Sequence, residues 1–181
     1  MMNALETIAA RKSVRSYKTT DVSDYQIDEI TKAAGLAPNA GPFHITLVQE
    51  SMALKEINDK ALKAMKESGN DFLRERAALP GYQPLYGAPL LFIFSAPASN
   101  PYSLANVSNA ATCASIAATA LLLGSCYVIT PTLALGADPA LAERIGIPHG
   151  FTAMCGLLVG YSGDEDFASP RHAEYTANTF A

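Results

Sequence analysis

Hydrophobic and polar positions repeat along the chain with two periods, and each period predicts a different element. Apolar residues at helical spacing predict helices at about 3–12, 24–35, 51–69, 108–123 and 139–145. Apolar runs rich in β-forming residues predict strands at about 43–49, 89–96 and 151–161, and an extended segment at about 127–129. The polar segment 70–86 is expected to be a connection, because it contains several glycine and proline residues.

Residues at the boundaries support several of these elements. Ser23 and Gln26 have capping-box spacing ahead of an apolar stripe, and Asp138 precedes a proline at a first helical position. Helices separate the strands along the chain, so we expect a mixed sheet flanked by helices. At 181 residues, without repeats or low-complexity segments, the chain is expected to be a single domain, 1–181.

Ionisable side chains are unevenly distributed. Residues 77–137 form 61 consecutive positions without Asp, Glu, Lys, Arg or His. A buried central strand followed by a buried helix would explain this stretch. Burial against a second subunit would explain it too, because charge is depleted at interface cores. The pattern favours an obligate homodimer.

A basic cluster lies near the N-terminus. Arg11, Lys12, Arg15 and Lys18 place four cations in eight residues, and no acidic residue lies between Glu6 and Asp21. Cations are favourable at the end of a helix, which would make the cluster a solvated helix terminus. Guanidinium groups also bind phosphate in a fork geometry, which would make it an anion site. Both interpretations stay open at this level; a tightly held phosphorylated cofactor would suit the second.

Composition excludes several classes of protein. The chain is 49% hydrophobic and 17% charged, a balance opposite to that of disordered proteins. Its net charge of −4 argues against general nucleic-acid binding. The apolar stretch 110–129 is diluted by polar residues and has no basic flank, so no membrane span is expected. With no signal-peptide pattern at the N-terminus, a cytoplasmic location is expected.

Few residue patterns point to chemistry carried by the protein itself. The three cysteines, Cys113, Cys126 and Cys155, lie in apolar surroundings and are expected to be reduced packing residues. The three histidines are far apart and form no metal-binding motif, so no metal site is expected. There is no G-x-S-x-G elbow, phosphate-binding loop or G-x-G-x-x-G motif. A bound cofactor would carry the chemistry without such motifs.

Four segments, taken in order, resemble the nitroreductase-like FMN flavoprotein family. They are R-K-S-V-R-S-Y (11–17), A-A-G-L-A-P-N-A-G (33–41), Y-G-A-P (86–89) with A-A-T-A-L-L-L-G-S-C (117–126), and I-P-x-G-F (147–151) leading to V-G-Y (159–161). The resemblance implies an α+β fold with a mixed or antiparallel central sheet flanked by helices. It also implies an intertwined homodimer with FMN at the subunit interface.

The resemblance assigns cofactor-binding residues from three regions. Arg11, Lys12, Ser13 and Arg15 would hold the FMN phosphate and ribityl chain, and Arg171 would also meet the phosphate. The loop from the other subunit would supply Pro38, Asn39, Ala40 and Gly41. Backbone groups of Ile129, Thr130 and Pro131 would approach the flavin ring near N5. No catalytic residue is assigned, and His44 and Cys126 are interpreted as ordinary structural side chains.

The activity implied is hydride transfer from NADH or NADPH through flavin to a small acceptor, by a ping-pong mechanism. Nitroaromatics, quinones or enone-like metabolites are the acceptor classes. The loop reads G-P-F-H-I-T at 41–46, without the family's Asn, Gln and Trp, and Thr112-Cys113 replaces its usual central-helix pair. Alternatives therefore stay open: oxygen-dependent flavin fragmentation, reductive dehalogenation, flavin binding without turnover, or a domain with no cofactor.

Overall fold

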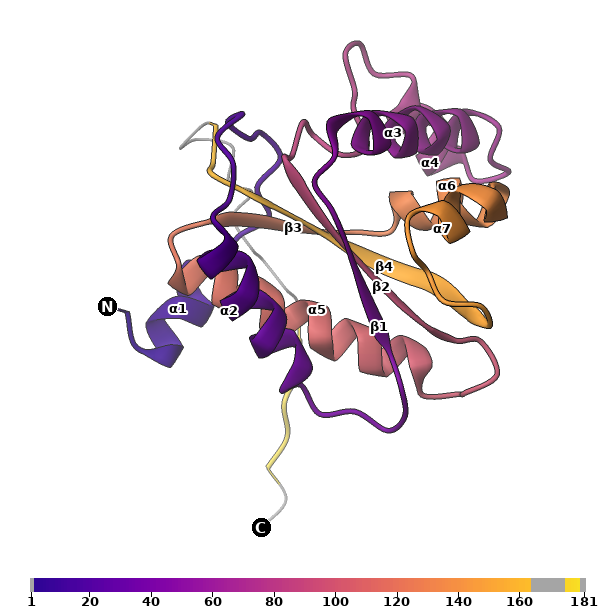
Figure 1. Cartoon of the computed structure of the whole chain (residues 1–181). Coiled ribbons are helices and arrows are strands. Elements are labelled where there is room, and N and C mark those ends of the chain that lie inside the picture. Colours follow the sequence, from indigo (N-terminus) through magenta and orange to yellow (C-terminus); the bar gives the residue numbers. More distant parts are fainter. Residues whose placement is uncertain (1, 164–174, 180–181) are drawn as a thin grey trace.

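The computed structural model describes residues 2–163 and 175–179. Its helices are α1 (Ala4–Ala10), α2 (Asp24–Gly35), α3 (Ser51–Lys66), α4 (Asp71–Ala77), α5 (Ser103–Ala120), α6 (Thr130–Ala137) and α7 (Pro139–Arg144). Its strands are β1 (His44–Val48), β2 (Leu90–Pro97), β3 (Gly124–Val128) and β4 (Phe151–Gly160). Figure 1 shows the helices lying on both sides of the strands. The expected α+β class is confirmed.

The four strands form one sheet in the order β1-β2-β4-β3, and every neighbouring pair is antiparallel. The expectation of a mixed sheet is therefore wrong for the described residues, and the antiparallel alternative is confirmed. The last strand in the chain, β4, inserts between β2 and β3, which places β3 at one edge of the sheet. Gly124 at the start of β3 pairs with Gly160 at the end of β4.

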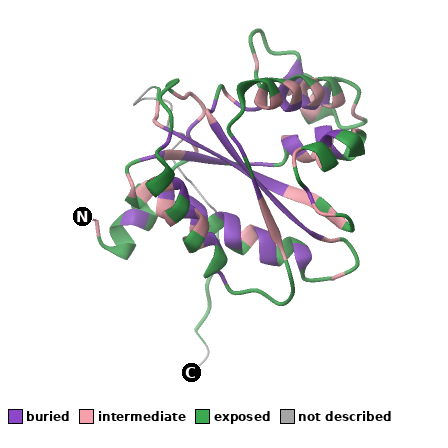
Figure 2. Cartoon of the chain, viewed as in Figure 1, coloured by how far each residue is buried: buried purple, intermediate pink, exposed green. Residues whose placement is uncertain are grey.

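Helices cover both faces of the sheet, so the central strands are buried on both sides (Figure 2). Alternate residues of β2 enter separate cores: Phe92 and Phe94 pack with α2 and α5, whereas Leu91 and Ile93 pack with α3, α6 and α7. A strand buried on both faces reads as a continuous apolar run, and the sequence of β2 has that character.

Some elements differ from the sequence-based expectations. Helix α4 occupies part of the expected connection; Asn70 caps it through a hydrogen bond from the Leu73 amide. Helix α6 was not expected, because it is short and apolar on most sides and so has no polar face to mark a helical period. Helix α5 begins at Ser103 rather than near 108, because the polar side chains of its first turns make tertiary contacts instead of facing water.

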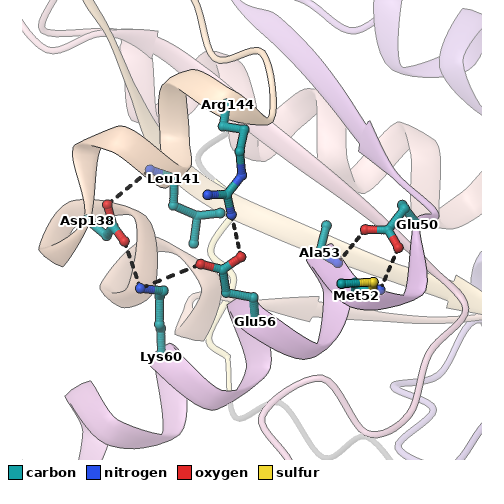
Figure 3. A network of polar contacts seen from close by, with 8 residues as sticks. All are labelled: Glu50, Met52, Ala53, Glu56, Lys60, Asp138, Leu141 and Arg144. Atoms are coloured by element: carbon teal, nitrogen blue, oxygen red, sulfur yellow. Dashed lines mark hydrogen bonds and ion pairs between the residues drawn. The ribbon is translucent and has the colours of Figure 1, made fainter.

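A polar network joins α3 to α7 and its cap (Figure 3). Lys60 donates to Asp138 at 2.7 Å and lies 3.6 Å from Glu56, which also pairs with Arg144. The second carboxylate oxygen of Asp138 caps α7 by accepting from the Leu141 amide at 3.0 Å. Because Asp138 directly follows α6, this network also fixes the far end of the helix that begins at Thr130.

Within the described ranges, no helix is both long enough and apolar enough to cross a bilayer. The three cysteines are free thiols; Cys126 and Cys155 are buried and Cys113 is half-buried. No cluster of three or more His, Cys, Asp or Glu side chains in this part of the chain could hold a metal ion.

Candidate cofactor site

Residues 11–18, which we name the strap, cross one end of the sheet. The Val14 amide donates to the Ser125 carbonyl at 2.9 Å, and the Lys18 amide donates to the Tyr161 carbonyl at 2.9 Å. The strap is therefore joined to the start of β3 and to the residue that follows β4. In Figure 1 this segment lies beside the end of the sheet where β3 begins.

Two glycines make room for the strap. A Cβ atom on Gly124 would lie 2.8 Å from the Val14 side chain, and one on Gly160 would lie 3.0 Å from Tyr17. Real Cβ atoms essentially never show the first of these separations, and the second is tighter than nine in ten real Cβ contacts. The paired glycines of β3 and β4 thus let the strap lie directly on the sheet.

The strap brings its cations together beside β3. Arg11 and Arg15 are half-buried and Lys12 is exposed. Burial raises the pKa of the Cys126 thiol on β3, while Arg15, the Ser13 side chain and Arg11 act to lower it. Three of the residues predicted to bind cofactor therefore interact with one buried side chain, and the thiol stays protonated at neutral pH.

The Tyr17 side chain links the strap to itself and to β4. Its hydroxyl donates to the Val14 carbonyl at 2.9 Å and lies 3.5 Å from the Leu158 carbonyl. Burial, followed by the nearby Cys126, raises the pKa of Tyr17 well above its ordinary value, so its hydroxyl remains a donor. The strap conformation is thus fixed by a tyrosine within its own sequence.

The first residues of α6 directly follow β3. Ile129 is 59% exposed, and no side chain caps the helix here. The Thr130 hydroxyl donates to the Pro84 carbonyl at 3.4 Å. The uncapped amides of a helix N-terminus favour partially negative ligand atoms. The structure thus places Ile129, Thr130 and Pro131 directly after β3, the strand that is bonded to the strap through Ser125.

The loop at residues 38–41 lies elsewhere in the chain. Asn106 Oδ1 accepts from the Ala40 amide at 2.8 Å, Asn100 Nδ2 donates to the Ala40 carbonyl at 3.0 Å, and Asn109 Nδ2 donates to the Pro38 carbonyl at 3.2 Å. We name these three residues the asparagine clamp.

The asparagine clamp holds the loop against the first half of α5, whereas the strap lies near the residues that follow the end of α5. At 1.5 Å per residue, roughly 21 Å of helix separates positions 106 and 120. One chain therefore does not bring the loop together with the strap.

Arg171 lies outside the described residues. His44 begins β1, and its carbonyl is 3.5 Å from the Ser95 hydroxyl. Sequence reasoning missed the asparagine clamp, because its residues pair with positions about 60 to 70 places away. The only signal was an excess of asparagine near the start of an apolar helix.

Comparisons with known proteins are consistent with this arrangement. The family model described as the nitroreductase family matches residues 8–161. A curated protein of Archaeoglobus fulgidus, named as an NADH dehydrogenase/NAD(P)H nitroreductase, is 39% identical over 62 residues. That match covers 33% of this chain and 36% of the relative's length.

Solved structures match along nearly the whole chain. A nitroreductase with bound FMN from Bacteroides fragilis is 26% identical, covers 100% of both chains and has a TM-score of 0.87. A nitroreductase with bound FMN from Desulfitobacterium hafniense is 22% identical, covers 98% of this chain and 100% of its own, and has a TM-score of 0.86. With the family model matching most of its length, the chain belongs to the nitroreductase family.

Proposed function

We propose that this protein is an FMN-dependent oxidoreductase that transfers a hydride from NADH or NADPH to a small organic acceptor. One observation carries the proposal: the strap is bonded to β3 through Val14 and Ser125, and its residues Arg11, Ser13 and Arg15 all interact with buried Cys126 of that strand. This arrangement occurs in a chain of the nitroreductase family, similar along its whole length to a nitroreductase with bound FMN.

The residues of the strap suit the phosphate end of FMN. Two guanidinium groups, one ammonium and one hydroxyl lie within five consecutive residues, and this donor set matches the charge and geometry of a phosphate. Close packing on Gly124 fixes the backbone that carries them. We assign Arg11, Lys12, Ser13 and Arg15 to the phosphate and ribityl chain, and Arg171 to the same phosphate.

The N-terminus of α6 suits the other end of the cofactor. Bound FMN supplies hydride transfer between a nicotinamide and an acceptor. Ile129, Thr130 and Pro131 present the open amides of the helix and an exposed apolar side chain to the ring. If nicotinamide and acceptor occupy this one place in turn, ping-pong kinetics are expected. Nitroaromatics, quinones and enone-like compounds are the acceptor classes to test.

A second copy of the chain completes the proposed site. The loop residues Pro38, Asn39, Ala40 and Gly41 cannot reach the strap of their own chain, so we assign them to the flavin of the partner. Apolar side chains are exposed within the uncharged stretch, among them Leu104 at 59% and Leu122 at 79%. Burial of such side chains at an interface would explain why 61 residues lack charge.

The decisive experiment is a visible spectrum of the purified protein, followed by identification of the released chromophore and by NADH and NADPH oxidation assays. The proposal expects an oxidised-flavin spectrum, FMN in the supernatant after heating, and bleaching by NADH or NADPH that an acceptor reverses. A protein that binds no added FMN would overturn the proposal. Retained FMN without acceptor-dependent reoxidation would instead leave a flavin-binding protein without turnover.

A further inference from the structure

The segment between α4 and β2, residues 78–89, lies beside the proposed flavin-ring position; we name it the connector. It is fixed on two sides. Buried Asn58 on α3 donates to Gln83 at 2.5 Å and accepts from the Leu85 amide at 3.2 Å. On the other side, the Pro84 carbonyl accepts from Thr130 at the start of α6. The connector is therefore held against the element assigned to the flavin ring.

Tyr86 in the connector has an unusual backbone conformation. Its φ is 52°, and the following Gly87 has φ of 71°, in a turn closed by the Ala88 amide bonding to the Leu85 carbonyl at 2.9 Å. Left-handed conformations favour glycine and asparagine and are unfavourable for other residues. A tyrosine held in this conformation is a reason to look for a function of its side chain.

The Tyr86 side chain belongs to a cluster of two tyrosines and one arginine. The rings of Tyr82 and Tyr86 meet edge to face with centroids 5.9 Å apart, and the Arg76 guanidinium lies 5.5 Å from the Tyr82 centroid. The Arg76 guanidinium also interacts with the Tyr86 hydroxyl. Tyr86 in turn packs in the same core as Tyr17 of the strap. Through Tyr86, the cluster thus reaches the core that contains Tyr17 of the strap and two residues of α6, Ala134 and Leu135.

Arg76 carries a charge that no carboxylate of the described residues neutralises within ion-pair distance. It is half-buried, and it is the last ionisable residue before the uncharged stretch. Its neighbour Arg74, by contrast, is exposed and paired with Asp71. A guanidinium has five N–H donors, and the two tyrosine hydroxyls can accept only some of them. The Arg76 guanidinium is held in place and keeps N–H donors that the tyrosines do not use, so it is suited to bind an anionic ligand.

We propose that Arg76, held by Tyr82 and Tyr86, recognises a carboxylate on the electron acceptor, so that the enzyme prefers anionic aromatic acceptors over neutral ones. This inference rests on the proposed function, because the position of Arg76 matters only if flavin binds beside α6. Arg76 is then a specificity-determining residue that makes no contact with the atoms exchanging hydride. The ring of Tyr82 holds the guanidinium in place and offers an aromatic face beside it.

The test compares ligands of the same shape and different charge. Benzoate and benzamide are titrated into the oxidised, FMN-loaded protein, and the perturbation of the flavin spectrum gives each Kd without turnover. We expect benzoate to bind about tenfold more tightly than benzamide, the gain typical of one charge-assisted hydrogen bond. Arg76→Gln should abolish this preference, and Arg76→Lys should keep part of it. Arg74→Gln, a cation of the same helix, should leave the preference unchanged.

Steady-state assays with 4-nitrobenzoate and 4-nitrobenzamide provide a second measurement. The expected result is a preference in kcat/KM for the acid that Arg76→Gln removes. FMN content and melting temperature are measured for each variant to show that it folds and is loaded. Equal affinity for benzoate and benzamide in a loaded, active enzyme would overturn the inference and leave the proposed function standing.

Two other results would also count against the inference. If Arg76→Gln weakened use of NADPH relative to NADH and left the benzoate preference intact, Arg76 would serve the reductant's phosphate instead. A protein that binds no FMN would overturn the proposed function and this inference together. The three failures are distinguishable, because they affect ligand charge preference, reductant preference and flavin content separately.

Discussion

Val14 lies directly on Gly124. The Val14 side chain occupies the space where a Cβ of Gly124 would be, and the Val14 amide donates to the carbonyl of Ser125, the residue after Gly124. This contact determines how close the cations of the strap approach β3. Because the strap has no regular secondary structure of its own, its conformation depends on such contacts with the sheet. The absence of a side chain at one β3 position thereby shapes the proposed phosphate site.

Gly124→Ala should lift the strap from the sheet. The added methyl group would meet Val14 at 2.8 Å, and overpacking of this kind costs about 1–3 kcal/mol. We expect a lower melting temperature and a weaker FMN affinity, measured by thermal unfolding and by flavin-fluorescence titration. Gly136→Ala is the matched control, because nothing lies within 4 Å of a Cβ at that helical position. Equal FMN affinity in both variants would contradict the role assigned to this contact.

Arg11→Ala should weaken FMN binding while the protein remains folded. Removing one guanidinium from a phosphate loses about 1.5–3 kcal/mol, or roughly ten- to a hundredfold in Kd. Equilibrium dialysis of FMN gives the affinity, and size-exclusion chromatography gives the assembly state. Arg74→Ala removes an exposed arginine that pairs with Asp71 of its own helix and should change neither. An unchanged FMN affinity in Arg11→Ala would contradict the phosphate site and favour the other interpretation of the basic cluster, a solvated helix terminus.

Asn106→Ala should release the loop at residues 38–41. The Ala40 amide would lose its acceptor at 2.8 Å, and an unsatisfied amide costs about 1–3 kcal/mol. Because we assign this loop to the flavin of the partner subunit, FMN affinity should fall about tenfold or more. Asn106→Asp keeps an acceptor for Ala40, and the Nδ2 atom that it replaces has no partner among the described residues. Asn106→Asp should therefore retain FMN; loss in both variants would contradict the role assigned to this hydrogen bond.

The sequence predicts those helices and strands that bury one face and expose the other. Ile27, Ile30 and Ala34 are buried on one side of α2, and the Ser23 capping box forms as its spacing indicates. Helix α6 has no comparable pattern, because its small and apolar residues pack in a core and leave little polar surface. A short helix whose stability comes from tertiary packing leaves no periodic signal.

The candidate site likewise has a part that the sequence predicts and a part that only the fold reveals. The charges of the strap are visible in the sequence as a local excess of cations, and in the structure Arg11, Ser13 and Arg15 all interact with Cys126 of β3. The contacts of Asn106 with Ala40 and of Thr130 with Pro84 join residues 66 and 46 positions apart, so no local pattern could predict them. The spatial separation of the loop from the strap likewise emerges only from the fold.

Leu104→Arg should separate the proposed dimer. Leu104 is 59% exposed on α5 within the uncharged stretch, and a charge buried in an apolar interface without a partner is strongly unfavourable. We expect sedimentation to show monomer and the FMN content to fall, although the strap itself is unaltered. Met52→Arg, also exposed but on α3 across the sheet, should remain dimeric. A dimeric Leu104→Arg variant with full FMN content would remove α5 from the interface that we propose.

Asp138→Asn should destabilise the protein near neutral pH and much less in acid. The hydrogen bond from Lys60, reinforced by the Leu141 amide, holds the pKa of the Asp138 carboxyl below its ordinary value. A group with a lowered pKa in the folded state contributes stability above its unfolded value, about 3.9, and loses it as the pH falls through the folded value. The difference in melting temperature between the two proteins should therefore shrink steadily below about pH 4. In a Lys60→Met background the same substitution should show little dependence on pH, because the cation that lowers the pKa is gone. A pH-dependent difference that survives in this background would assign the effect to the capping of α7 instead of to the ion pair.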